Sequence, residues 1–465
     1  MNTNIRRKTR RKQRAHQRAR KTRNPNDWAY YKALQTEVQK ETRIAHRNYV
    51  QEVVSNYFNE KPKRFWSYVK SKRQESSGVS SLVDKDGFLH SNSKQKAEIL
   101  NDQFHSVYTT EDHNNFPEKG RSQYPTMDKI KVHCNGVLKL LKNLKVHKAT
   151  GPDDIPAYIL KAATHELAPI LTHLYQSSLD RSEVPTDWKE ALIVPLFKKG
   201  EKHKASNYRS VSLTSIACKI IEHIIHSSVI NFLEDQKILK DNQHGFRARR
   251  SCETQLISTI HDIANKLRTG RDQVDLIQLD FAKTFDKVPH RRLLHKLHYY
   301  GIRNETHRWI ESILQSRKQQ VVHMLENCRS NQADVLSGVP QRTILGPILF
   351  LVFINDLPEV VKHSSVQLFA DDCILFKHIE SSGNAMKLQQ ELTSLEESDQ
   401  QWQMKFHPEK CTVMRLGTNS RMKRDTNYSA RTHPRSRVIE QVPWSQYQRR
   451  PNMERPHRKD SQQSK

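Results

Sequence analysis

Two adjacent aspartates between two apolar runs constrain this chain more than any other stretch of its sequence. Residues 366–376 read VQLFADDCILF, with Asp371 and Asp372 at the centre. The apolar flanks predict the two strands of a hairpin, so both acids lie at or near its turn. Neighbouring carboxylates repel each other when partly buried, unless a cation compensates them. A plain polar hairpin tip is the simpler interpretation, because Asp is an ordinary turn residue.

A third acid ends another predicted strand. The segment QVDLIQLDF (273–281) reads as a strand that brings Asp280 to a strand-to-helix corner. An acid there faces the crevice where open sheets bind ligands, although Asp280 taken alone also suits a helix N-cap. One carboxylate on a strand and two on a neighbouring hairpin match what two divalent cations need to promote in-line phosphoryl displacement. Mg²⁺ prefers such oxygen ligands, and its charge would relieve the repulsion.

The charge balance indicates a polyanionic partner. Lys and Arg number 78 against 50 Asp and Glu, a formal charge of +28, which favours nucleic acid or an anionic membrane surface. The first 23 residues are almost all basic or polar and cannot bury a core alone. They suit a flexible nucleic-acid arm, a nuclear-import signal or a solvated linker.

Cysteine spacing and apolar content indicate the compartment. The six cysteines include no CxxC pair, which supports neither a disulfide framework nor a zinc site. No signal peptide is evident, and the longest apolar stretch, residues 344–354, is too short to span a bilayer. We therefore expect an intracellular protein of the nucleus or cytoplasm, with no membrane partner.

Helical and strand patterns alternate through the middle of the chain. Residues 27–58 have helical periodicity, and residues 61–72 place aromatic rings among lysines, where they stack on bases or pack on a helix. From about residue 128 onward, helices and short apolar strands mix, which predicts an α+β domain. The last 45 residues are polar and basic without a sustained period, so we expect them to be disordered. The predicted strands are 191–197, 273–281 and 319–325, and the predicted helices are 215–233 and 290–302.

Six motifs follow one another along the chain. They are KATGPDDIPAYILK (148–161), VPLFKKGEKHKASNYRSVSL (194–213), HGFRARRSCETQLI (244–257), LDFAKTFDKVPH (279–290), SGVPQRTILGPILFLVFINDLP (337–358) and LFADDCILF (368–376). In order and spacing these motifs resemble the reverse transcriptases of non-LTR retrotransposons, of the jockey-like long interspersed kind. The resemblance extends over roughly residues 20–417.

The resemblance implies a right-hand polymerase and assigns roles to individual residues. Asp280, Asp371 and Asp372 would bind two Mg²⁺ ions, with Mn²⁺ as a substitute, and Lys410 would protonate the pyrophosphate leaving group. Phe285 would exclude a 2′-hydroxyl, and Gln341 would touch the template base or the incoming nucleotide. The triphosphate would be held by Arg209 with Lys198 or Lys199, and nucleic acid by Arg247, Arg249 and Arg250. The implied substrates are an RNA template, a DNA primer and dNTPs.

The implied domains follow the motifs along the chain. They are a basic helical extension (1–75), a helical lead-in (76–135), fingers (136–270), a palm (271–415) and a divergent basic tail (416–465), with the thumb missing or truncated. The tail residues QYQRRPNMERPHRK (446–459) can be encoded by codons that, in another frame, resemble the family's missing segment. We therefore expect a chain truncated at both ends, with a frameshift at its C-terminal side.

The sequence departs from the family pattern at two further places. Arg342 and Thr343 stand where the family has Gly-Ser, and glycine there would allow close backbone approach to a ligand. Ser210 replaces a proline that would fix φ. The competing hypothesis is a catalytically inactive, nucleic-acid-binding remnant that keeps the charge but not the chemistry.

Overall fold

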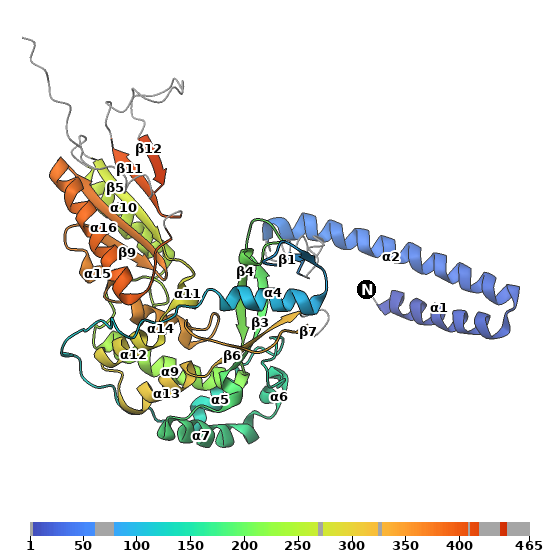
Figure 1. The fold of residues 1–465 in the computed structure, drawn as a ribbon. Helices are drawn as coiled ribbons and strands as arrows, with labels where there is room; N and C mark the ends of the chain where they lie inside the picture. Colours follow the sequence, from blue (N-terminus) through green and yellow to red (C-terminus); the bar gives the residue numbers. More distant parts are fainter. Residues whose placement is uncertain are drawn as a thin grey trace, which may run out of the picture. The chain divides into compact units, whose positions relative to one another are not determined.

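The computed structural model describes residues 3–60, 79–267, 273–323, 328–407, 410–417 and 438–443. These residues fall into two compact units, one before and one after residue 78, and each is described by itself. The second unit carries every residue for which the sequence predicts a role in nucleotide chemistry (Figure 1).

The first unit is a pair of helices, α1 (Thr3–Thr22) and α2 (Pro25–Glu60), which lie side by side (Figure 1). The structure favours the expected helical extension over a flexible arm for the first 23 residues, because α1 is a helix that packs on α2. Small and apolar residues make this contact possible despite the charge of α1. Those buried are Ile5, Ala15, Ala19, Leu34 and Val38. The helix predicted for residues 27–58 is confirmed by α2.

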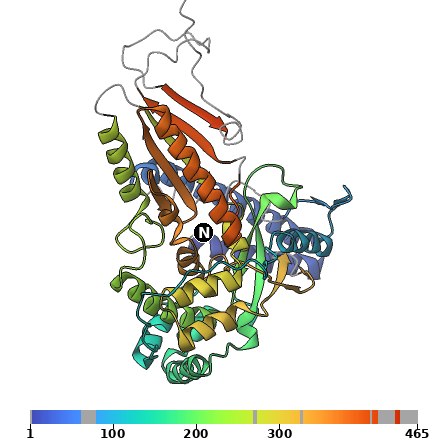
Figure 2. The same ribbon diagram turned by 60° about the vertical axis from the view of Figure 1, so that its left-hand side comes forward.

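A five-stranded antiparallel sheet, the palm sheet, forms one end of the second unit. Apolar residues alternate along its strands and face helices on both sides. The helix α10 (Cys252–Lys266) covers one face through Ile263, and α16 (Ser382–Trp402) covers the other through Leu388 and Leu392 (Figure 2). The strand order is β12 (Val438–Pro443), β11 (Thr412–Gly417), β5 (Gln273–Asp280), β10 (Asp372–Ile379) and β9 (Ser365–Phe369).

A second sheet, the fingers sheet, is mixed. The strand β3 pairs antiparallel with β4 and parallel with β6, and β6 also pairs with the short strands β7 and β8. The helix α4 (Ser93–His105) packs on this sheet, and the two-stranded hairpin of β1 (Leu82–Val83) and β2 (Leu89–His90) adjoins it. The sheet strands are β3 (Glu190–Phe197), β4 (Tyr208–Leu213), β6 (Lys318–His323), β7 (Cys328–Arg329) and β8 (Ala333–Asp334).

A layer of helices joins the two sheets and contains most of the core. Its centre is α14 (Leu345–Ile354), which is apolar on every side and therefore almost wholly buried. By length and composition one described helix, α9, could cross a membrane, but a buried core helix passes the same test. The other helices are α5 (Cys134–Lys142), α6 (Ala157–Ala162), α7 (Thr164–Arg181), α8 (Thr186–Lys189), η1 (Ala205–Asn207), α9 (Ile216–Asp235), α11 (Thr284–Lys287), α12 (His290–Tyr299), α13 (Asn304–Leu314) and α15 (Leu357–Val360).

The strands and helices predicted for the second unit are present, but the sheets do not follow the predicted division of the chain. Residues 318–334 belong to the predicted palm, yet their strands complete the fingers sheet. Conversely, α10 belongs to the predicted fingers, yet it packs on the palm sheet.

The structure also differs from the predictions for the helical lead-in and for the C-terminal tail. Much of the predicted helical lead-in is irregular chain, with α4 as its long helix among the described residues. Within the tail, β12 is an ordered strand, contrary to the expected disorder. Residues 418–437 and 444–465 lie outside the described residues, as does the segment 61–72 with its aromatic rings, so a missing thumb stays a prediction.

Candidate active site

The three predicted acids meet at one end of the palm sheet. Asp280 is the last residue of β5 and pairs in register with Asp372, the first residue of β10. Directly opposed residues of an antiparallel pair have side chains on the same face, so these two carboxylates are neighbours. Asp371 lies in the turn just before β10 and accepts a hydrogen bond from Thr284 Oγ1 at 3.2 Å. The predicted hairpin thus presents two of the acids beside the third.

A buried glutamine outside the predicted site holds this turn in place. The Gln243 side chain accepts from the backbone N–H of Ala370 (2.8 Å) and donates to the carbonyl of the same residue (3.3 Å). Ala370 adopts φ +53°, a conformation that a side-chain-bearing residue needs support to keep. A side chain on Gly245 would come within 2.2 Å of the Ala370 nitrogen, so only glycine permits the approach. Gln243 directly precedes the HGFR motif and Gly245 is the second residue of that motif, but these residue types do not predict a contact with Ala370.

The loop after α16 brings Lys410 to the acids. The ring of Phe406 stacks on Phe281 with centroids 4.4 Å apart, and the backbone N–H of His407 donates to the Asp280 carbonyl at 2.7 Å. Lys410 Nζ then lies 3.2 Å from Asp280 Oδ2. The structure therefore places Lys410 beside one of the predicted metal ligands, and its role as a proton donor stays a prediction.

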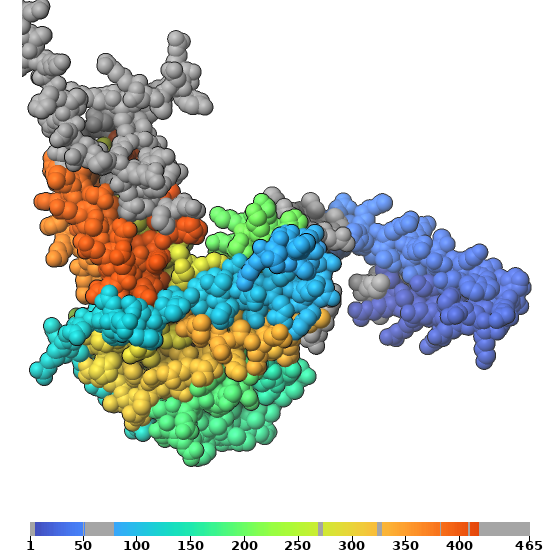
Figure 3. Space-filling view, viewed as in Figure 1, coloured from blue at the N-terminus to red at the C-terminus, as the bar shows by residue number. Residues whose placement is uncertain are grey.

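The β3–β4 hairpin supplies further cations. Burial lowers the pKa of Lys198, and the nearby charges of Arg209 and Lys410 lower it further, while Asp280 opposes them. These interactions place Lys198 and Arg209 with Lys410 and Asp280 around one region. Lys199 is exposed beside Lys198. Figure 3 shows a hollow here, between the green β3–β4 hairpin and the orange and red palm segments, with yellow residues after β5 at its floor.

The acids repel each other, and a cation would relieve this. Partial burial raises the pKa of Asp372, and the charges of Asp371 and Asp280 raise it further. Carboxylate oxygens are suitable ligands for Mg²⁺ or Mn²⁺, so the donor chemistry fits a divalent ion. Among the residues that the structure describes, however, no three His, Cys, Asp or Glu side chains are already gathered closely enough to hold one. Binding would therefore require side-chain movement, including release of Asp280 from Lys410.

Phe285, Gln341 and Ser210 converge on Asp286, a residue outside the predicted site. Gln341 Nε2 donates to Asp286 Oδ1 at 3.0 Å, and Ser210 Oγ lies 3.5 Å from the same oxygen. Burial raises the pKa of Asp286. The Phe285 ring packs between Phe350 (centroids 5.1 Å apart) and the exposed Phe246 (6.4 Å). Asp286 thus ties three motifs together.

Arg342 keeps the backbone conformation that glycine favours. Its φ is +66°, so the arginine stands in the left-handed region, which residues with side chains seldom occupy. Its side chain lines a cavity of about 540 Å³ between α5, β4 and α9. The polar lining of this cavity, the basic cavity, includes no acid. Its basic residues are Lys145, Lys148, Lys219, His223 and Arg342.

The three arginines predicted to contact nucleic acid have different surroundings. Arg247 is nearly buried and forms two hydrogen bonds with the Glu234 carboxylate, at 2.8 and 2.6 Å, which favours a structural role. Arg250 pairs with Asp241 at 2.5 Å. Arg249 is exposed, with φ +61°. Contact with nucleic acid stays a prediction for all three, and Arg249 is the most accessible.

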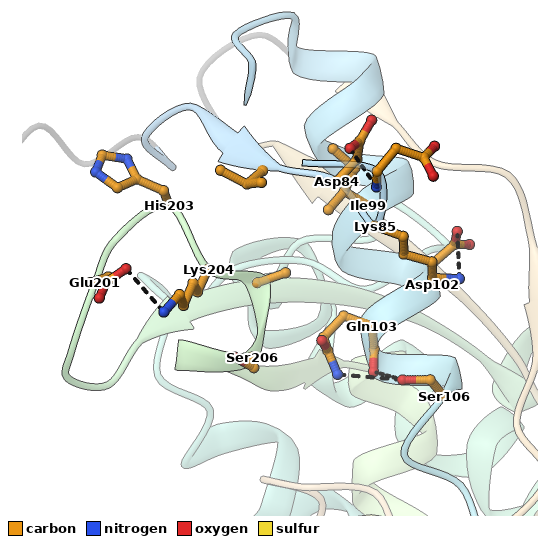
Figure 4. A pocket seen from close by; sticks show the side chains of 13 residues that line it. Asp84, Lys85, Ile99, Asp102, Gln103, Ser106, Glu201, His203, Lys204 and Ser206 are labelled. Carbon is orange, nitrogen blue, oxygen red and sulfur yellow. Dashed lines mark hydrogen bonds and ion pairs between the residues drawn. The ribbon is translucent and has the colours of Figure 1, made fainter. Parts of the chain in front are cut away.

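Another cavity, of about 570 Å³, lies away from these residues, between α4, β1 and the β3–β4 connection (Figure 4). Its lining includes four acids, Asp84, Asp86, Asp102 and Glu201, but only two lysines. Lys204 pairs with Glu201 at 3.2 Å, and Lys85 pairs with Asp102 at 3.8 Å. Its lining therefore keeps an excess of acids, which does not suit a nucleotide, and none of the predicted site residues lines it.

Comparison with known proteins defines the class to which this fold and site belong. Residues 198–446, more than half of the chain, match the family described as reverse transcriptase (RNA-dependent DNA polymerase), and the chain therefore belongs to that family. The family has a polymerase fold of palm and fingers, which agrees with the two sheets.

Individual relatives narrow the class to non-LTR retrotransposons. The probable RNA-directed DNA polymerase from transposon BS of Drosophila melanogaster is 25% identical over 401 residues, covering 78% of this chain and 43% of the relative. The RNA-directed DNA polymerase from mobile element jockey of the same species is 26% identical over 289 residues, covering 60% and 31%. The predicted resemblance to jockey-like elements is confirmed. The chain spans less than half the length of these relatives.

Proposed function

We propose that this chain catalyses RNA-templated DNA synthesis at the end of the palm sheet. The observation that carries the proposal is the in-register pair of Asp280 and Asp372, with Asp371 on the adjoining turn and Lys198, Arg209 and Lys410 around them. Acids and cations gathered at one point suit a reaction on a triphosphate, in which both the metal ligands and the phosphate ligands are needed.

Each group would have a distinct task. Asp280, Asp371 and Asp372 would hold two divalent cations, Mg²⁺ or Mn²⁺, which when bound would neutralise charge on the reacting phosphate and activate the primer 3′-hydroxyl. Arg209 and Lys198, with Lys199, would hold the triphosphate. Lys410 would leave Asp280 and donate a proton to the departing pyrophosphate.

Nucleotide selection would depend on Phe285 and Gln341. The Phe285 ring, supported by Phe350, would lie under the incoming sugar and exclude a 2′-hydroxyl. Asp286 accepts a hydrogen bond from Gln341 Nε2, which would leave the amide oxygen of Gln341 available to the substrate. The templating strand would pass the basic cavity beside Arg342, and synthesis would take place in the nucleus or cytoplasm.

One observation favours the second candidate, a nucleic-acid-binding remnant without activity. Arg342 occupies a glycine conformation next to Gln341, where its side chain takes space that a glycine would leave open. A template strand bound there would meet the guanidinium directly. Salt-sensitive binding would then persist without primer extension.

Primer extension distinguishes the two functions. The purified chain would be given a DNA primer on an RNA template, dNTPs and Mg²⁺ or Mn²⁺, beside Asp371→Asn, which keeps the size of the side chain and removes its charge. We expect extension by the natural sequence and a loss of about a hundredfold or more in the variant, the scale of removing one transition-state-stabilising group.

Two further results would decide against polymerase activity. Extension that is unchanged in Asp371→Asn would come from another source, such as a contaminant. Binding of primer–template without any extension would support the remnant, and recovery of extension in Arg342→Gly would then identify the arginine as the cause.

A further inference from the structure

The helix α1 carries more positive charge than its packing neutralises. Ten of its twenty residues are Arg or Lys, and none is Asp or Glu. The cations that face α2 have partners there. Lys8 pairs with Glu37 at 2.7 Å and also with Glu41, and Arg18 pairs with Asp27 at 3.2 Å. The acids of α2 thus compensate one side of α1 only.

The opposite side of α1 forms a row of exposed cations, the α1 stripe, made of Arg6, Arg10, Arg14 and Lys21. The helical period puts these residues on one face, away from the buried alanines. Among the described residues, none of the four has an acidic partner. Like charges four residues apart destabilise a helix by a few tenths of a kcal/mol per pair, so α1 tolerates a repulsion that a polyanion would remove.

We propose that the α1 stripe binds the phosphate backbone of a nucleic-acid double helix, independently of the polymerase site. A membrane-binding helix needs a free apolar face, and that face of α1 is buried against α2. Proteins that bind single strands stack bases on free aromatic rings. Here the rings of Trp28 and Tyr31 pack on His16, with centroids 5.9 and 4.8 Å away, and the exposed Tyr30 accepts a hydrogen bond from Arg11 Nε at 2.9 Å.

The shape of α1 also suits a duplex. A helix is about 10–12 Å across with its side chains, and the major groove of B-DNA is about 12 Å wide. Arg6, Arg10 and Arg14 follow one another about 6 Å apart along the helix axis. Arginines spaced in this way meet successive phosphates without reading base edges, so the binding should be independent of sequence.

Salt-dependent duplex binding tests the proposal on the full chain. Fluorescence anisotropy would follow a labelled 20-base-pair DNA of mixed sequence between roughly 50 and 300 mM salt. In the triple variant Arg6→Gln, Arg10→Gln, Arg14→Gln, we expect weaker binding and a salt slope smaller by about 2 to 3, since each phosphate contact contributes about 0.9. Glutamine is a good helix former, and circular dichroism would check that α1 remains helical.

A charge-matched control variant distinguishes binding by the α1 stripe from a general effect of lowering the net charge. Lys32, Lys40 and Arg43 are exposed on α2, and their triple substitution by Gln removes the same charge. The proposal requires a clearly smaller change of slope in this control. Equal effects in both variants, or no effect in the α1 variant, would overturn it.

Other ligands give a second comparison. The α1 variant should lose more affinity for the duplex than for a single strand of equal length or for anionic lipid vesicles. A larger loss on either of those ligands would also overturn the proposal. None of these measurements needs primer extension, so an inactive polymerase site would leave their outcome unaffected.

Discussion

The position of the hairpin acids depends on a single amide. Gln243 satisfies both backbone polar groups of Ala370, the residue that precedes Asp371. Because Gln243 is 4% exposed, water cannot replace these bonds without opening the core. The amide is therefore a positioning group for Asp371 and Asp372, although it touches neither.

Replacing Gln243 should impair the chemistry more than the binding of nucleic acid. Gln243→Leu leaves the buried N–H and carbonyl of Ala370 unpaired, which costs about 1–3 kcal/mol per group and frees the turn. We expect primer extension to fall by about 10- to 100-fold, with primer–template affinity nearly unchanged. Gln243→Glu, which keeps an acceptor for the Ala370 N–H, serves as the control and should lose less. Normal extension by a folded Gln243→Leu protein would contradict this role.

The repulsion among the acids should appear as pH-dependent stability. The pKa of Asp372 is raised in the folded state, so the fold binds this proton more tightly than the unfolded chain does. Stability from this group is therefore present at low pH and is lost as the pH rises through the raised pKa. Asp372→Asn should melt slightly higher than the natural sequence near pH 8 with a chelator present, and the difference should shrink near pH 4. A lower melting temperature for the variant near pH 8 would show that another contact dominates.

At the scale of elements, the buried Arg292 links residues 111–115, which precede α5, to the layer of helices. Arg292 on α12 is 1% exposed and lies 3.1 Å from Glu111. It also donates to the carbonyls of Asp112, Asn115 and Gln401 at 2.7 to 3.1 Å. These bonds join residues 111–115, α12 and the end of α16, the helix that leads into the Lys410 loop.

Removing Arg292 should lower the free energy of unfolding substantially. Arg292→Ala leaves Glu111 without its buried partner, so we expect a loss of about 3–5 kcal/mol in the free energy of unfolding, measured by urea denaturation. Arg308→Ala is the matched control, because Arg308 is largely exposed and lies 4.0 Å from Glu305. It should change stability by less than about 1 kcal/mol. Similar losses in both variants would contradict the importance assigned to burial.

At the scale of the whole molecule, the two units should function separately. The palm, the fingers and every residue proposed for catalysis lie after residue 78. We expect a chain of residues 79–465 to unfold cooperatively and to extend a primer at low salt as fast as the full chain does. Its affinity for duplex DNA should be lower, because α1 is gone. Failure of this shorter chain to fold would show that the units depend on each other.

Much of the fold follows from local patterns, because each pattern reports burial along one element. The apolar patterns of residues 273–281 and 215–233 predict a strand and an amphipathic helix, and both are present as β5 and α9. The pairing of strands is not local. Nothing in residues 318–323 indicates that β6 joins β3 in parallel, because that pairing links segments more than a hundred residues apart.

The sequence by itself determined the family and predicted Asp280, Asp371 and Asp372 as a group, because motif order and residue chemistry can be read along the chain. It also singled out Arg342 as a departure from the family's glycine, but the φ of +66° at this residue is known only from the structure. Only the tertiary structure shows that Gln243 supports the turn before Asp371 and that Asp286 contacts residues of two other motifs. It also shows that Arg247 forms an ion pair with Glu234. It also decided that the basic N-terminus is a packed helix with one neutralised face. These features depend on tertiary contacts between residues that are far apart in the sequence. Such contacts, rather than the neighbouring residues along the chain, determine hydrogen-bond partners and burial.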